Sequence, residues 1–133
     1  MSSRKPHATD RVRARAKLWL EAEEDYVLGL GIAEILAAVE RTGSIKEAAE
    51  EVDKSYRHVW ARIKAVEEHL GVELVRTQVG GAERRRSALA PGASELVSAF
   101  LELRERVFAL VEEEYAARLR PALERLLEDG QSD

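Results

Sequence analysis

With 133 residues, 45% of them hydrophobic and 35% charged, the chain is long enough for one domain and an additional element. It contains no cysteine, which excludes disulfides and thiolate zinc sites, and no apolar run approaches the roughly 18 residues that cross a membrane. The basic N-terminus has no apolar stretch behind it, as a signal peptide would, so we expect a cytoplasmic protein with no membrane partner.

The formal net charge of −4 hides an uneven distribution along the chain. Residues 1–20 carry six basic and one acidic group, net +5, and residues 41–90 carry ten and eight, net +2. Residues 91–133 carry five and ten, net −5. This polarity would let one face approach phosphate groups while another stays in water.

The N-terminal part is expected to be a disordered tail over residues 1–10, followed by a strand. Apolar and basic residues alternate over residues 12–20, and a period of two is typical of a half-buried strand. Glu23, Glu24 and Asp25 would form a turn, and residues 26–28 a returning strand. The basic residues are then either a solvated strand face or an arm that follows phosphates.

The next segment predicts two helices. Apolar residues at helical spacing over residues 32–39 indicate a helix that ends near Gly43. Ser44 and Glu47 have the spacing of a capping box, in which the hydroxyl and the carboxylate each accept a backbone N–H at the start of a short second helix. The small Ala48 and Ala49 would face inward and let a crossing helix pack closely.

A third helix is predicted after a turn at residues 53–54. Ser55 would cap it, Gly71 would end it, and four apolar residues share one stripe that must be core, namely Val59, Ile63, Val66 and Leu70. Two short helices with a tight turn, the second beginning with polar and basic residues, are typical of a DNA-reading helix-turn-helix.

A β-hairpin and a long helix complete the predicted fold. Residues 72–76 and 84–89 are expected to be strands joined by a Gly-rich turn at residues 79–82, a wing. A helix would run from Pro91 to about Pro121, which kinks or ends it. Its heptad-like seam predicts a dimer interface, the alternative being packing on its own domain; the seam residues are Leu96, Phe100, Leu103, Val107 and Leu110.

The predicted fold is therefore mainly α with small β: a winged helix-turn-helix with an N-terminal strand pair and a long C-terminal dimerisation helix. The domain boundaries that follow are a disordered tail over residues 1–10, a DNA-binding domain over 11–90, a helical dimerisation element over 91–128, and a C-terminal tail over 129–133.

Several of these residues resemble one family. The sequence is similar to the N-terminal DNA-binding domain of molybdate-responsive regulators of the ModE type, within the broader LysR-like winged helix-turn-helix group. The similarity covers roughly residues 16–112, and the residues that carry it are Gly43-Ser44-Ile45, Ala48-Ala49, Ser55-Tyr56, Trp60, Ile63, Leu74-Val75-Arg76 and Gly80-Gly81.

The chain departs from that family in two ways. Leu89-Ala90-Pro91-Gly92-Ala93 stands where the family often has Leu-Thr-x-x-Gly, so the capping hydroxyl is missing. Full-length members carry C-terminal oxyanion-binding domains, whereas only a helix and a tail are expected after residue 112. The molybdate or tungstate response is therefore not carried over, and a separate oxyanion-binding or regulatory protein is one conceivable partner.

Double-stranded DNA is the predicted partner. The predicted contacts lie on the third helix, the residues before it and the wing: Ser44, Lys54, Ser55, Tyr56, Arg57, Trp60, Lys64, Arg84, Arg85 and Arg86. Arg57 could pair bidentately with guanine. Trp60 either packs inside the domain or contacts a sugar or thymine methyl, Tyr56 belongs either to the core edge or to the DNA face, and Lys64 either reaches phosphate or is merely solvated.

The predicted function is a sequence-specific, homodimeric transcription regulator. Two alternatives remain open: a winged helix that pairs with another regulator, and a chromatin-like protein that coats DNA without sequence preference. No catalytic residue, metal site or cofactor is predicted, because the three histidines are not at metal-ligand spacing and no nucleophile or phosphate-loop motif occurs.

Overall fold

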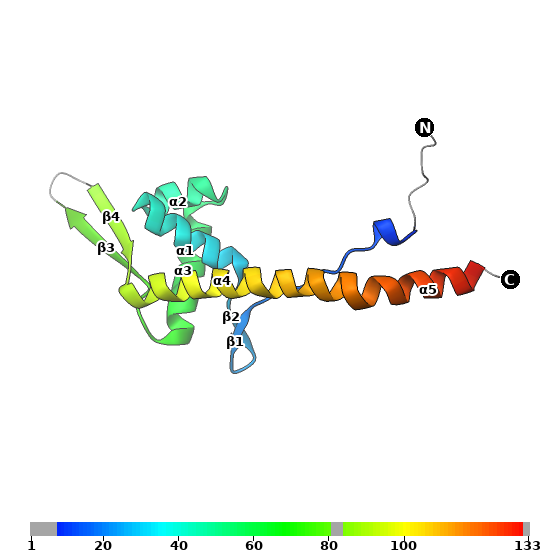
Figure 1. Cartoon of the computed structure of the whole chain (residues 1–133). Coiled ribbons are helices and arrows are strands. Elements are labelled where there is room, and N and C mark those ends of the chain that lie inside the picture. Colours follow the sequence, from blue (N-terminus) through cyan, green and yellow to red (C-terminus); the bar gives the residue numbers. More distant parts are fainter. Residues whose placement is uncertain (1–7, 81–83, 132–133) are drawn as a thin grey trace, which may run out of the picture. The chain divides into compact units, whose positions relative to one another are not determined.

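The computed structural model describes residues 8–80 and 84–131 (Figure 1). The elements in chain order are η1 (Ala8–Arg11), β1 (Leu20–Ala22), β2 (Asp25–Leu28), α1 (Leu30–Thr42), α2 (Ile45–Glu51), α3 (Tyr56–Leu70), β3 (Val75–Gly80), β4 (Arg84–Leu89), α4 (Pro91–Glu114), η2 (Tyr115–Leu119) and α5 (Arg120–Gln131). Helices dominate, the strands form two antiparallel hairpins, and the predicted fold class is confirmed.

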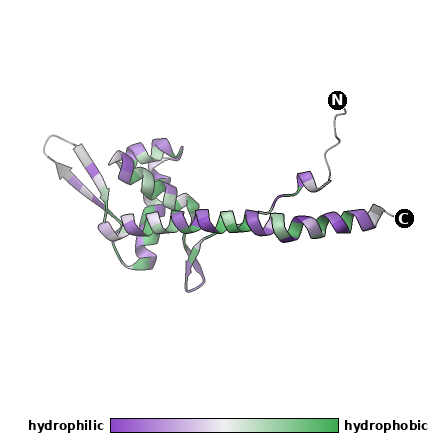
Figure 2. Cartoon of the chain, viewed as in Figure 1, coloured by the Kyte–Doolittle hydropathy of each residue, from purple (hydrophilic) through white to green (hydrophobic). Residues whose placement is uncertain are grey.

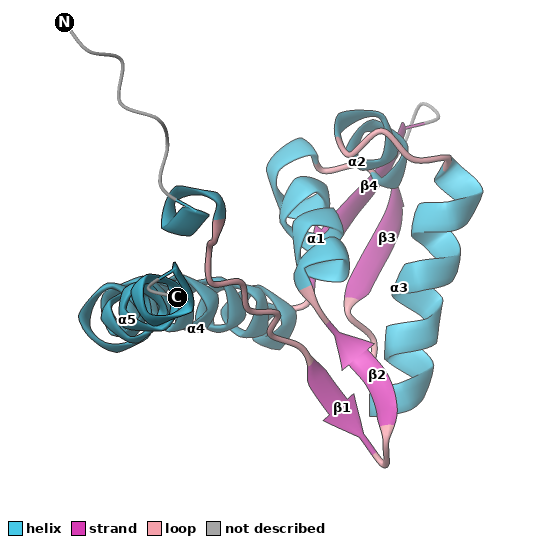
Figure 3. Ribbon diagram, turned by 90° about the vertical axis from the view of Figure 1, so that its right-hand side faces the viewer, coloured by secondary structure: helices cyan, strands magenta, loops and turns pink. Residues whose placement is uncertain are grey.

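The chain divides into two compact units. The core unit is Leu18–Leu103, and the terminal unit combines Met1–Lys17 with Arg104–Asp133. In the core unit α1, α2 and α3 form a cluster with the β3–β4 hairpin beside it (Figure 3). The largest fully buried side chains come from β2, α1 and α3: Leu28, Ile32, Leu36, Val39, Val59 and Ile63.

Glycines and serines set the helix ends as predicted. Gly43 and Gly71 end α1 and α3 with φ of 73° and 68°, a left-handed conformation that glycine adopts without steric cost. Ser55 Oγ accepts the His58 amide at 3.0 Å, and Ser44 Oγ accepts the Glu47 amide at 3.1 Å. These caps fix where each helix begins.

The capping box at Ser44 is only half formed. The Ser44 amide donates to Thr42 Oγ1 at 3.3 Å, and not to the Glu47 carboxylate as predicted. Thr42 at the end of α1 therefore joins the two helices. The core stripe of α3 is also one residue shorter than predicted: Val59, Ile63 and Val66 are buried, but Leu70 is exposed because it lies in the last turn, immediately before Gly71.

The first predicted strand is much shorter than its alternation suggested. Pairing is confined to β1 and β2, with the predicted turn at Glu23 and Glu24, both at positive φ. The partner strand has only four residues before Gly29 begins α1, so residues 12–19 have no strand to pair with among the described residues. The alternation of apolar and basic residues over residues 12–19 therefore does not correspond to a paired strand.

The wing forms, but its first strand is displaced toward the C-terminus. β3 begins at Val75, which pairs with Leu89, and not at Val72. The Leu74 and Val75 amides donate to the Glu67 carboxylate at 2.7 and 3.2 Å, which holds residues 72–74 around the end of α3. The strand extends to Gly80 within the predicted turn, and residues 81–83 lie outside the described part.

The predicted interface seam on α4 includes one residue that the core unit buries. Phe100 is 3% exposed and packs with Val97 and Ala93 in the hydrophobic core, and Leu96 packs partly against it. The prediction was wrong for Phe100, because the first turns of α4 close the core of their own unit. Leu103 and Leu110 are 46% and 55% exposed.

In the terminal unit the helix continues beyond the predicted break. Pro121 lies in the first turn of α5, directly after the π-helical turn η2. A proline removes one helical N–H and crowds the carbonyl four residues earlier, and a wider turn there relieves the clash. Helix also extends through residues 129–131, where a tail was predicted, and η1 replaces the end of the predicted N-terminal tail; residues 1–7 and 132–133 lie outside the described part.

Candidate nucleic-acid interface

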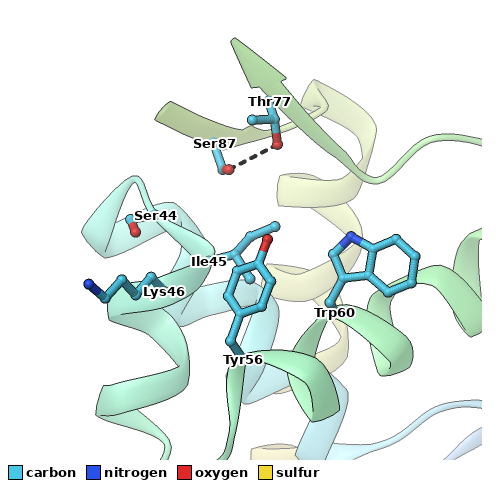
Figure 4. Close-up of a pocket in the computed structure, with 7 residues that line it drawn as sticks. All are labelled: Ser44, Ile45, Lys46, Tyr56, Trp60, Thr77 and Ser87. Atoms are coloured by element: carbon cyan, nitrogen blue, oxygen red, sulfur yellow. Dashed lines mark hydrogen bonds between the residues drawn. The ribbon is translucent and has the colours of Figure 1, made fainter. Parts of the chain in front are cut away.

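A groove of about 720 Å³ lies between the helix-turn-helix and the wing (Figure 4). Residues from the start of α2, from the first turns of α3 and from both wing strands line it: Ser44, Ile45, Lys46, Tyr56, Trp60, Thr77 and Ser87. Three separate segments thus meet at one surface. This surface includes the N-terminal turns of α3, which are predicted to enter DNA.

Two aromatic side chains stand at the helical wall of this groove. Tyr56 and Trp60 are one turn apart on α3, so they share a face, and they are 47% and 46% exposed. Neither is enclosed in the core. Half-exposed Tyr and Trp offer apolar area together with a hydrogen-bonding group, a combination suited to a wet interface.

The cations near the start of α3 differ in how they are held. Arg57 is exposed, and its side chain makes no hydrogen bond or ion pair with the described residues. Lys54 is exposed in the turn, where Asp53 adopts φ 58° and the Lys54 amide donates to Ala49 O. Arg57 and Lys54 are therefore available to an external anion.

Lys64 is committed to its own helix. Its Nζ lies 3.0 Å from Glu67 Oε1 and 5.6 Å from the centroid of the Trp60 ring. The ammonium thus has an anionic partner and an aromatic one. At this surface Lys64 therefore holds Trp60, and its contact with phosphate stays a prediction.

Glu67 links α3 to the wing. Partial burial opposes its ionisation, but hydrogen bonds from the Leu74 amide, Lys64 and the Val75 amide outweigh that effect and lower the pKa of its carboxyl below the ordinary value. The ionised carboxylate accepts both amides and the ammonium together. The orientation of the hairpin relative to α3 therefore depends on one charged side chain.

The other wing strand is fastened to the α1–α2 junction. The Ser87 amide donates to Gly43 O at 2.8 Å, and the Ser87 and Thr77 hydroxyls lie 3.0 Å apart. These two residues face each other in the hairpin register. Sequence analysis missed Thr77 and Ser87 as lining residues, because their meeting depends on a register that only pairing defines.

The wing arginines are described unevenly. Arg86 is exposed on β4, opposite Gln78. The side chains of Arg84 and Arg85 lie outside the described part of the structure, so those two predicted contacts stay predictions.

Sequence analysis also missed Ile45 and Lys46 as lining residues of the groove. They line it because Ser44 places the first turn of α2 at its edge.

In the described part of the chain, no group of histidine, aspartate and glutamate side chains is arranged to hold a metal ion. No helix of that part combines the length and apolarity needed to cross a bilayer.

Residues 31–86 match the family described as bacterial regulatory helix-turn-helix protein, lysR family. Over these residues the chain is similar to a DNA-binding helix-turn-helix domain of transcription regulators. The match runs from α1 into β4 and includes the groove residues that come from α2, α3 and β3.

One curated relative and two solved structures give further comparisons. The chain is 36% identical over 66 residues to the molybdenum-pterin-binding protein MopB of Rhodobacter capsulatus, which covers 50% of this chain and 24% of that protein. The CbnR_DBD–DNA complex matches with TM-score 0.54 at 19% identity over 68% of this chain and 98% of that one. The BenM_DBD/benA site 1 DNA complex matches with TM-score 0.51 at 19% identity over 68% and 96%. The two structures share the fold with this chain.

Proposed function

We propose that this protein is a sequence-specific regulator that binds double-stranded DNA as a homodimer. One observation carries the proposal: the Ser55-capped start of α3 presents Tyr56, Arg57 and Trp60 toward solvent beside a wing fastened to both α1 and α3. The first turns of a recognition helix contact base edges, while neighbouring residues and the wing hold phosphates.

Roles follow from the environment of each side chain. Arg57 pairs with a guanine edge, Tyr56 and Trp60 make apolar contacts with sugar or thymine methyl, and Lys54 and Arg86 contact phosphate. Ser44 and Ser55 cap helices and leave their remaining acceptor capacity at the surface. Arg84 and Arg85 are further candidates for wing contacts from the sequence alone, and because neighbouring residues of a strand alternate between its faces, the three wing arginines cannot all contact DNA.

The ModE-type character is part of the proposal. The 36% identity to MopB supports it, as do the residues of the Ser55-to-Ile63 segment. Because the chain spans about a quarter of the length of that relative, the oxyanion response of whole regulators is not assigned to it. A separate oxyanion-binding or regulatory protein is the partner proposed as a source of such a signal.

Dimerisation rests on the exposed leucines of the long helical region. Leu103 and Leu110 lie seven residues apart on α4, the spacing of a coiled-coil seam, and both are about half exposed. A two-fold dimer would read an inverted repeat with half-sites one helical turn apart, or a multiple of it.

Selection from a pool of random duplexes at about physiological salt tests the function. Wild type is expected to enrich an inverted repeat. Arg57→Ala should weaken binding to that repeat about 5- to 150-fold, equivalent to about 1–3 kcal/mol, and relax the preference at one position.

Arg62→Ala is the matched control. Arg62 lies on the same helix but stacks 5.7 Å from the Tyr26 ring centroid, on another side of the domain. Its removal should leave the selected motif unchanged. Retention of duplexes without any motif would contradict sequence-specific binding, and equal binding by wild type and Arg57→Ala would contradict the assigned role of α3.

A further inference from the structure

The N-terminal segment of the terminal unit carries an unusual concentration of charge. Residues 11–17 contain four basic side chains, Arg11, Arg13, Arg15 and Lys17, and no acidic one. All four are exposed. The sequence offered a solvated strand face as their explanation, but this segment pairs with no strand in the described structure.

The segment is nevertheless held in place. Tyr115 Oη donates to Val12 O at 3.1 Å, and the Val12 amide donates to Thr9 O at 3.1 Å. Tyr115 and Thr9 are both buried. One end of the segment is therefore anchored to the helical region of its own unit by groups that carry no charge.

Beyond the anchor, the segment follows the apolar side of α4 within the same unit. Residues 13–16 border a groove of about 260 Å³ together with Phe108, Val111 and Glu112. Small alanines alternate with the arginines here. An extended chain advances about 3.3 Å per residue, so the Cα atoms of every second residue, where the cations stand, are about 6.6 Å apart.

Arg11, Arg13 and Arg15 make no side-chain hydrogen bond or ion pair with the residues that the structure describes. Glu114, which precedes Tyr115 on the helix, is paired with Arg118 at 2.8 Å. Three exposed, unpaired guanidinium groups on an anchored segment form a surface suited to a polyanion, and anchoring lowers the entropy lost on binding.

We propose that residues 11–17 are a basic arm that contacts the phosphate backbone of duplex DNA, in addition to the helix-turn-helix and the wing. This inference rests on the proposed function, because duplex DNA is the polyanion that the proposed function supplies. The contacts are with phosphates and carry no sequence information. The arm therefore strengthens binding to every duplex alike.

The test is the salt dependence of binding by the full chain. The variant R11Q/R13Q/R15Q keeps Thr9, Val12 and Tyr115 and so preserves the anchor. Probes are the duplex selected from the random pool and an unrelated duplex of equal length. Each lost phosphate contact should reduce the slope of log K against log salt by about 0.9 and weaken binding roughly fivefold near physiological salt.

The control variant R106Q/R118Q/R125Q removes the same charge from the helical part of the same unit and keeps Arg120, whose guanidinium lies 5.4 Å from the ring centroid of the anchoring Tyr115. We expect it to bind with the wild-type slope, and the arm variant to lose affinity by the same factor on both duplexes with its selected motif unchanged. An equal loss of affinity in both variants would mean that net charge alone determines binding, and would overturn the proposal of a basic arm.

Unchanged slope and affinity in the arm variant, with wild type still selecting a motif, would overturn the arm and leave the proposed function standing. Failure of wild type to bind any duplex would instead refute the proposed function, and the arm with it. A loss confined to anionic phosphatidylglycerol vesicles would identify a membrane contact and reject DNA as the partner.

Discussion

The core unit and the terminal unit use apolar residues in opposite ways. In the core unit the apolar faces of α1, α3 and early α4 are buried against one another. Among the described residues of the terminal unit, only Thr9 and Tyr115 are buried, while Leu110, Leu119 and Leu126 are 55–67% exposed. Figure 2 shows hydrophobic and hydrophilic residues alternating along α4 and α5. The core unit thus has a buried apolar core beside its exposed aromatic residues, whereas the described apolar side chains of the terminal unit are mostly exposed.

Substitution of one leucine in each unit should show this difference between the units most strongly. Leu36→Ala in α1 removes a fully buried side chain and is expected to cost about 2–5 kcal/mol of unfolding free energy. Leu126→Ala in α5 removes a side chain that is mostly in water and should cost less than about 0.5 kcal/mol. Urea unfolding monitored by circular dichroism measures both. Comparable losses would show that the terminal helix is as tightly packed as the core.

A charged pair placed on α4 tests what covers the exposed leucines. The variant L103E/L110E should be monomeric by light scattering where wild type is dimeric, because two carboxylates cannot be buried in an apolar seam without a large desolvation cost. Affinity for the inverted repeat should fall at least about tenfold, since one half-site no longer aids the other.

The matched control for that variant is S98E/E102Q, which changes two exposed α4 residues that are not part of the leucine pair. It should remain dimeric. If L103E/L110E forms dimers as stable as those of wild type, the two leucines do not lie in the dimer interface. Pairing with a different protein would then be favoured as their role.

A smaller effect is expected from the carboxylate that joins α3 to the wing. Glu67→Gln should cost about 1 kcal/mol, because an amide oxygen accepts the Leu74 and Val75 amides less strongly than a carboxylate does. Since the folded state lowers the Glu67 pKa, this contribution is full above the ordinary value of 4.5 and is lost as the pH falls through the lowered pKa. Wild type and variant should converge in acid.

Glu114→Gln is the corresponding change in the terminal unit. Glu114 pairs with Arg118 on an exposed helix surface, where such pairs contribute little. Thermal unfolding between about pH 3 and 7 should show a pH-dependent difference between wild type and Glu67→Gln, and at about pH 7 Glu114→Gln should lose less stability than Glu67→Gln. The reverse ranking would show that Glu67 is not what holds the wing to α3.

What the sequence predicts well here depends on near neighbours. Ser55, Gly43 and Gly71 mark helix ends through bonds that span three or four residues, and each lies where expected. The order of elements from α1 to α4 follows from these signals and from apolar spacing. The region that matches the lysR family, residues 31–86, covers α1 to the first part of β4 and ends before α4.

What the sequence predicts poorly depends on contacts between residues far apart in the chain. The alternation over residues 12–19 has the period of a strand, but a strand also needs a neighbour, and β2 is too short to provide one. The groove wall formed by Thr77 and Ser87 needs the hairpin register, and the Glu67 contacts need the chain to turn back after Gly71. Phe100 fits a heptad and a core equally well, and only the packing of α4 decides.

The π turn before Pro121 changes the phase of the apolar surface along the helix. Leu103 and Leu110 are seven residues apart, as are Leu119 and Leu126, but nine residues separate the two pairs. A seven-residue repeat interrupted in this way does not keep one seam. A partner helix aligned on the first pair therefore meets Leu119 and Leu126 on a different side of the helix, and one straight seam does not cover both pairs.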